Sequence, residues 1–181
     1  MPRAEGLDPA EIYEYLAMAR ERVLAAARGL TFEQYTREFP FGKRTLRHTL
    51  VEIPLAESNY VRRLQGEPVP PLREHPFARF YETDFPPLEA AWREQAEVTR
   101  QVLRSIADWT RPVEYVVRQP DRPARRVRTT AGGVATQLLL HEVHHRAQAM
   151  AMLRQLGAPV ETIDYSALAF HTETLPEGSS R

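Results

Sequence analysis

Apolar residues recur at helical spacing in four long stretches of the chain, and this pattern constrains the fold most. The last stretch is the clearest, because Thr129 or Thr130 can cap its start and Gly157 and Pro159 can end it. It runs from about residue 131 to residue 156. The other three stretches run from about 9 to 28, 43 to 64 and 84 to 106. Helices of this length with one apolar side must pack against one another.

A short β-hairpin is predicted between the third and fourth stretches. Residues 112–118 and 125–129 have the composition of strands, and residues 119–123 between them that of a turn. A lone hairpin is weak, so we expect it to rest on the helices. We therefore predict an all-α fold, a four-helix bundle with a small β-hairpin before the last long helix. Residues 1–181 are expected to form one domain, with 172–181 disordered.

The composition excludes several classes of function. The 24 basic and 24 acidic residues cancel, which argues against a nucleic-acid partner. The chain has no cysteine, so any transition metal must be held by His, Asp or Glu. No apolar run approaches the roughly 20 residues that span a bilayer, and the N-terminus does not resemble a signal peptide. We expect a cytoplasmic protein without a membrane partner.

The segment from His141 to Gln148 is the most informative for function, because three of the chain's six histidines fall within it. His141 and His145 lie about 40° apart on a helix, at the spacing at which two imidazoles can bind one cation. His144 lies about 60° to the other side of His141, so that pair is the second choice. Gln148 continues the stripe of His141 and His145 and should lie beside a bound ion.

A catalytic metal site usually needs a third protein ligand. His48 is the best candidate, since it lies in a predicted helix on one stripe with Glu52. Ligands in a helical bundle project inward from facing helices. His75 and His171 are the alternatives, but both lie in irregular segments.

Residues 141–145 also spell His-Glu-x-x-His, in which the Glu can act as a general base of a zinc protease. Such an enzyme would need a downstream ligand, for which Glu161 and Asp164 are the nearby options. Glu142 has a simpler role available, an ion pair with Arg146 four residues later on the same helix.

The segment His141-Glu-Val-His-His-Arg-Ala-Gln148, followed by Leu153-Arg-Gln-Leu-Gly157, resembles the signature of the DinB/YfiT-like family, the DNA-damage-inducible group. Ala147 stands where the family commonly has Gly, a change that leaves the histidines in place. An earlier histidine in the second helix is also expected of the family, and His48 matches it.

The resemblance implies an up-down-down-up order of the four helices and, often, a dimer. It also implies a divalent metal, typically zinc or nickel, held by His48, His141 and His145, with His144 as a neighbour. Characterised relatives include transferases that use low-molecular-weight thiols such as bacillithiol, and a mycothiol-dependent isomerase.

Three functional classes follow. The first is a metal-dependent transferase that joins a small thiol to a small-molecule substrate in detoxification or stress response. Arg125, Arg126 and Arg128 could hold the thiol's anionic groups, although a solvated hairpin edge explains them more simply. The second is a metal-dependent hydrolase in which Glu52 or Glu142 assists a metal-bound water, with Gln148 a further catalytic candidate. The third is a non-catalytic metal-binding protein. A homodimer is expected, and Leu139, Val143 and Met150 could pack on the partner; burial inside the same bundle is the alternative for these residues.

Overall fold

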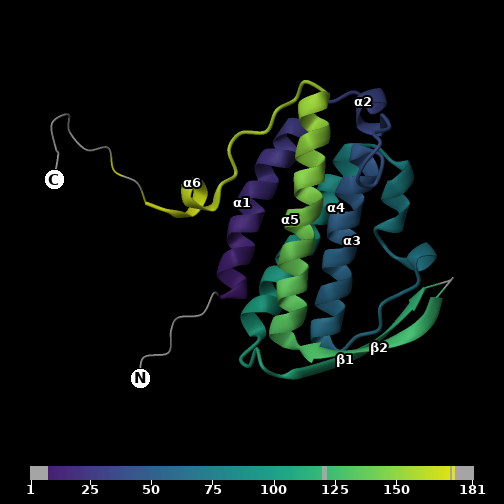
Figure 1. The fold of residues 1–181 in the computed structure, drawn as a ribbon, viewed down its shortest axis with the longest axis vertical. Coiled ribbons are helices and arrows are strands. Elements are labelled where there is room, and N and C mark those ends of the chain that lie inside the picture. Colours follow the sequence, from purple (N-terminus) through teal and green to yellow (C-terminus); the bar gives the residue numbers. More distant parts are fainter. Residues whose placement is uncertain (1–7, 120–121, 172, 174–181) are drawn as a thin grey trace.

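The structure, a computed structural model, describes residues 8–119, 122–171 and 173, and four long helices dominate it (Figure 1). They lie side by side, and α1 and α3 each contact both α4 and α5. The chain runs toward one end of the molecule in α1 and α5 and toward the opposite end in α3 and α4 (Figure 1). The four helices are α1 (Pro9–Arg28), α3 (Leu46–Gln65), α4 (Phe85–Ser105) and α5 (Ala131–Gln155).

The helices begin where the sequence supplies capping side chains. Asp8 accepts a hydrogen bond from the Ala10 backbone N–H at 2.9 Å, and Thr130 accepts one from Gly133 at 3.1 Å. The predicted cap of the last helix is thus confirmed at Thr130. Helix α3 continues through Pro54. Across the described residues, no helix is both long enough and apolar enough to cross a membrane.

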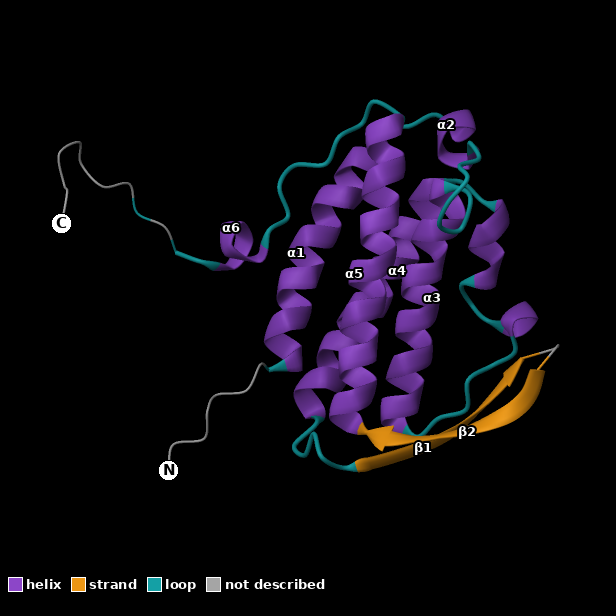
Figure 2. Cartoon of the chain, in the orientation of Figure 1, coloured by secondary structure: helices purple, strands orange, loops and turns teal. Residues whose placement is uncertain are grey.

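The predicted strand pair is confirmed and lies across one end of the long helices (Figure 2). Strand β1 (Pro112–Gln119) pairs antiparallel with β2 (Arg122–Thr130), with Tyr115 opposite Val127. Part of the expected turn, residues 120–121, and the expected disordered tail, except residue 173, lie outside the described residues. The structure is therefore mostly helical, with one small sheet before the last long helix.

Four short helices connect or follow the long ones: α2 (Phe32–Thr36), η1 (Leu72–Glu74), η2 (Ala78–Glu82) and α6 (Tyr165–Ala169). Helix α2 begins with a capping box formed by Thr31 and Gln34. Helix η2 packs against α3 and carries Tyr81.

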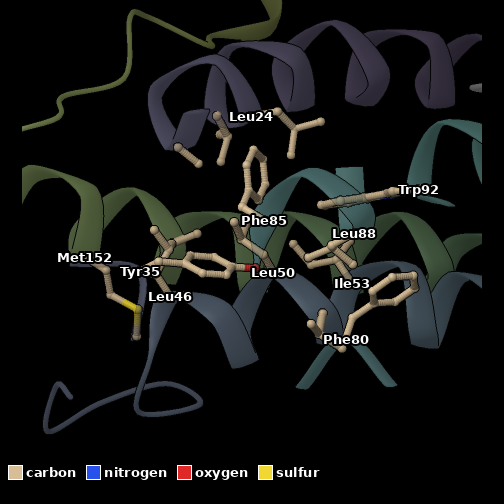
Figure 3. Close-up of a cluster of buried hydrophobic side chains, with 14 of the residues drawn as sticks. Leu24, Tyr35, Leu46, Leu50, Ile53, Phe80, Phe85, Leu88, Trp92 and Met152 are labelled. Carbon is tan, nitrogen blue, oxygen red and sulfur yellow. The ribbon is translucent and has the colours of Figure 1, made fainter. Parts of the chain in front are cut away.

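The apolar core consists of two clusters. Figure 3 shows one of them, in which Leu24 comes from α1, Leu50 from α3, and Phe85 and Trp92 from α4. The other includes Tyr13, Leu103, Val113, Val134 and Leu138. Glu57 of α3 bonds to Tyr13 of the second cluster and to Trp92 of the first, so a polar group lies where the clusters meet.

Glu57 belongs to a buried ionic network centred on Arg20. The Arg20 guanidinium lies 2.5 Å from a carboxylate oxygen of Glu142 and 3.3 Å from one of Glu57. Arg146 pairs with Glu142 at 3.5 Å, which confirms the ion pair predicted from their spacing. Further hydrogen bonds to Glu57 come from Tyr13, from Trp92 at 3.1 Å and from Thr99 at 2.6 Å. Two arginines and two glutamates thus balance in charge inside the fold.

Candidate metal centre

Three side chains that can bind a metal converge between α3 and α5: Glu52, His141 and His145. One potential ligand atom from each lies within 4.8 Å of the other two. Nε2 of His141 is 4.0 Å from Oε1 of Glu52, and the two imidazole rings have centroids 4.5 Å apart. Atoms bound to one ion at about 2.1 Å lie at most about 4.2 Å apart, so the group is close to the required size.

The pair His141 and His145 comes together because both lie on one face of α5, one turn apart, as the sequence predicted. Helix α3 packs against this face and brings Glu52 opposite the histidines. His145 is buried, whereas His141 and Glu52 are partly exposed. The group therefore lies at the edge of the core, with two of its members partly exposed.

The carboxylate of Glu52 is oriented by two neighbours that both bind the same oxygen. Nζ of Lys43 lies 3.1 Å from Oε2, and the hydroxyl of Tyr81 donates to Oε2 at 3.2 Å. Burial, together with the Glu52 charge, raises the pKa of Tyr81, so its hydroxyl keeps the proton that it donates. Oε1 is the oxygen that faces His141. Hydrogen bonds of this kind, which hold a metal-binding side chain in one orientation, are typical of metal sites.

His145 is oriented in the same way by Gln148. The Nδ1 of His145 lies 2.9 Å from the amide oxygen Oε1 of Gln148, an acceptor, so Nδ1 carries the proton. Nε2 of His145 then has its lone pair free for a ligand bond. The amide nitrogen of Gln148 lies 2.9 Å from Nε2 of His144, which holds the amide in this orientation. The sequence placed Gln148 beside the histidine pair, and the structure shows it there.

The surroundings of both histidines of the pair favour the neutral imidazole. Burial and the neighbouring His145 lower the pKa of His141 to about 4, and burial lowers the pKa of His145. A neutral imidazole is the form that binds a metal. Two imidazoles and one carboxylate are also a known ligand set of catalytic zinc sites. The residues present therefore fit a divalent transition metal.

Comparison with known proteins agrees with the sequence signature. The sequence model of the DinB family matches residues 1–177, nearly the whole chain. The chain belongs to the DinB family. A search of curated proteins gave no match. The resemblance predicted from the histidine segment is thereby confirmed.

The third histidine expected from the DinB resemblance, His48, lies outside the group of three. It lies on α3, one turn before Glu52, and its ring packs edge-on against the Tyr81 ring with centroids 5.3 Å apart. Glu52 is the residue of α3 that lies in the group of three, and Tyr81 contacts both Glu52 and His48. His48 as a ligand stays a prediction, which metal binding by variants can test.

The remaining histidines are not members of this group of three, although the His144 ring lies 4.9 Å from the His145 ring, centroid to centroid. His144 is exposed and bonds to Gln148, as expected for a neighbour that is not a ligand. His75 is buried in the segment between α3 and η2, where its Nδ1 accepts a hydrogen bond from the Phe77 N–H at 3.1 Å. His171 is exposed and lies 3.5 Å from Glu173.

Two of the acidic candidates have other partners. Glu142 is buried in the Arg20 network, which occupies its carboxylate with Arg20 and Arg146. Glu161, a downstream ligand in the protease hypothesis, lies at the surface 3.6 Å from Arg22. The structure thus favours a structural role for Glu142.

Sequence reasoning missed Lys43 and Tyr81, the residues that orient Glu52. Lys43 is the single lysine among 24 basic residues, but no spacing rule connects it with Glu52. Tyr81 lies in a short 3₁₀ helix after a proline-rich segment, and nothing in its local pattern indicates a contact with α3. Only the packing of η2 on α3 brings Tyr81 to the site.

Proposed function

We propose that this protein binds one divalent transition metal, zinc or nickel, through His141, His145 and Glu52, and acts there on a small molecule. One observation carries the proposal. One potential ligand atom from each residue converges, while Oε2 of Glu52 bonds to Lys43 and Tyr81 and Nδ1 of His145 bonds to Gln148. Chance clusters of histidine and glutamate have no reason to be oriented in this way.

Within this proposal, the preferred activity is transfer of a low-molecular-weight thiol to an electrophilic substrate. A divalent metal lowers the pKa of a thiol or water that it binds. The chain has no cysteine, so the thiol has to come from a small molecule. The partial exposure of His141 and Glu52 supports access for such a molecule. A cytoplasmic location, where such thiols are abundant, belongs to the same proposal.

Two alternatives remain open, and each depends on a particular residue. In a hydrolase, Glu52 would assist a water rather than hold the metal, a role for which Glu142 is poorly placed because its carboxylate is paired with Arg20. In a non-catalytic protein, His48 would join the other three residues as a fourth ligand and close the site.

We further propose that the four long helices form the up-down-down-up bundle of the family and that the protein is a homodimer. Supporting the dimer, Val143 on the outer side of α5 is 42% exposed, and its neighbour Leu140 is 59% exposed. Leu139 and Met150, the other predicted contact residues, are partly buried against the core. Sedimentation equilibrium of wild-type protein and Val143→Glu tests this, with a monomeric wild type as the contradicting result.

The metal proposal is tested by zinc affinity in wild-type protein, Glu52→Ala and His48→Ala, using a competing chelator. If Glu52 is a ligand, its removal weakens zinc binding by about 100-fold or more, and removal of His48 has an effect of less than about ten-fold. The reverse order would establish the three-histidine site instead. Equal, small losses in both variants would contradict a metal site at this position.

The activity is tested separately with the zinc-loaded protein. Thiol consumption in the presence of electrophiles is compared with hydrolysis of an ester panel. Zinc-dependent thiol consumption supports the transferase. Ester hydrolysis without thiol consumption would favour the hydrolase, and inactivity with both panels would favour the non-catalytic protein.

A further inference from the structure

Arg63, near the end of α3, is held between two tyrosine rings. Its guanidinium carbon lies 5.1 Å from the ring centroid of Tyr60 and 4.3 Å from that of Tyr115 on β1. All three side chains are partly exposed. A guanidinium packed in this way is fixed in orientation by cation–π contacts and remains charged at all physiological pH values.

Within the described residues, Arg63 has no carboxylate partner, unlike its neighbour Arg62, which pairs with Glu67 at 3.3 Å. Its Nε is also buried without a hydrogen-bond partner in that part of the chain. The same holds for Oδ1 of Asn59, one helical turn earlier on α3. Buried polar atoms are rarely left unbonded, so two of them one turn apart indicate a place for a polar ligand.

This arginine lies next to the metal centre. The Tyr60 ring that packs on Arg63 also packs edge-on against the His141 ring, with centroids 5.9 Å apart. One tyrosine side chain therefore separates the guanidinium from a proposed metal ligand. A small molecule bound at Arg63 would therefore lie one tyrosine ring away from His141.

We propose that Arg63, flanked by Tyr60 and Tyr115, is an oxyanion subsite that binds a carboxylate or phosphate of the small molecule used at the metal centre. The guanidinium donates paired hydrogen bonds to the oxyanion, which its planar shape fits. Oδ1 of Asn59 is an acceptor, so it would take a hydrogen bond from a hydroxyl or amino group next to the anion. The link to the metal centre rests on the proposed function, whereas anion binding at Arg63 does not require a metal.

The probe for this subsite is inorganic phosphate, titrated into the metal-free full-length protein, because a bound metal would itself attract phosphate. Binding is followed by NMR at the Arg63 side-chain Nε–Hε group and at the Tyr60 and Tyr115 amides. In wild-type protein, we expect the chemical shifts of these groups to change and to saturate at millimolar phosphate concentrations. The absence of saturable shifts at Arg63 would overturn the proposal.

Variants locate the binding. Arg63→Gln should weaken phosphate binding by about ten-fold or more, and Arg63→Lys, which keeps the charge but loses the planar fork, should give an intermediate loss. Arg62→Gln, one residue away and paired with Glu67, is the matched control and should change it by less than about two-fold. An equal loss in Arg62→Gln would show non-specific attraction to positive charge and overturn the subsite.

A second readout separates this subsite from the metal proposal. Zinc affinity of Arg63→Gln should equal that of the wild type, since Arg63 touches none of the proposed ligands. If wild-type protein binds phosphate at Arg63 but no zinc, the metal proposal fails and the subsite stands. If it binds zinc but not phosphate, the subsite fails alone.

Discussion

Helix α5 contributes to two clusters of ionisable groups that differ in how their polar atoms are bonded. Glu142 and Arg146 enter the buried network of Arg20, where each charge lies against an opposite charge. His141 and His145 meet Glu52 in the other cluster, at the edge of the core. In the first cluster the charged side chains are paired with one another. In the second cluster one potential ligand atom of each side chain faces a common point.

The comparison shows that residue type alone does not separate structure from function. Both clusters contain glutamate, and the His-Glu-x-x-His segment supplies one cluster with histidines and the other with Glu142. What distinguishes them is bonding: Oε2 of Glu52 and Nδ1 of His145 are occupied by neighbours that leave the opposite atoms available. Side chains whose polar atoms are all bonded to one another stabilise the fold. Side chains that are held in place but keep one polar atom unbonded can bind a ligand.

The largest expected effect is loss of metal binding in His145→Ala. Removing one of three ligands should reduce zinc affinity by more than about 1000-fold, because the remaining two do not hold the ion at micromolar concentration. The helical content, measured by circular dichroism, should stay at the wild-type level. His144→Ala, an exposed neighbour on the same helix, is the control and should lose far less. A greater loss in His144→Ala would show that the helix presents a different pair.

Changes in the Arg20 network should instead lower the free energy of unfolding. Arg20→Met leaves Glu57 and Glu142 buried without their shared partner, and we expect a loss of about 3–5 kcal/mol in the free energy of unfolding, measured with urea. Arg93→Met, at an exposed position, removes ion pairs with Glu21 and Glu89 and should cost about 1 kcal/mol or less. Zinc stoichiometry of folded Arg20→Met should be unchanged. Equal losses in the two variants would mean that the network does not hold the core together.

Gln148→Ala tests the two clusters further, because it removes the hydrogen bond that orients His145 but leaves all three proposed ligands in place. We expect zinc affinity to fall by about 10- to 100-fold, with little change in stability. The same chelator competition measures it. An unchanged affinity would show that Gln148 does not fix the tautomer of His145.

His75 combines features of the Arg20 network and of the metal centre. One of its ring nitrogens is bonded, and the other is buried without a partner in the described residues. Burial lowers the pKa of His75 to about 4. The unfolded chain, with a pKa near 6.5, then binds the proton first, so His75 costs stability increasingly as the pH falls from about 6.5 toward 4.

The variant His75→Asn keeps an acceptor for the Phe77 N–H and cannot take up this proton. Its free energy of unfolding should fall less between pH 6.5 and pH 4.5 than that of the wild type, by about 1 kcal/mol or more. His171→Asn, at an exposed position, should follow the wild-type pH profile. Parallel profiles for all three proteins would contradict a depressed pKa at His75.

Local sequence rules predicted much of the fold. The bounds of the long helices, the cap at Thr130 and the hairpin follow from spacing, capping residues and turn composition, which act over a few residues. The pair His141 and His145 follows from helical geometry, as does the ion pair between Glu142 and Arg146. These features need no knowledge of how the helices pack.

Features that depend on packing could not be predicted in the same way. Arg20 and Glu142 are 122 residues apart, and no local pattern connects them. The choice between His48 and Glu52 is of the same kind, since both lie on one stripe of α3 and only the rotation of α3 against α5 brings Glu52 opposite His141. Tyr81 reaches Glu52 from a segment without regular spacing.

X-ray absorption spectroscopy at the zinc edge of the zinc-loaded, full-length protein tests the central claim most directly. We expect about two imidazole ligands per zinc with the remaining ligands oxygen, and loss of the imidazole signal in the double variant His141→Ala, His145→Ala. Zinc with no imidazole ligands in wild-type protein, or a spectrum unchanged in the double variant, would contradict a metal centre built on these two histidines.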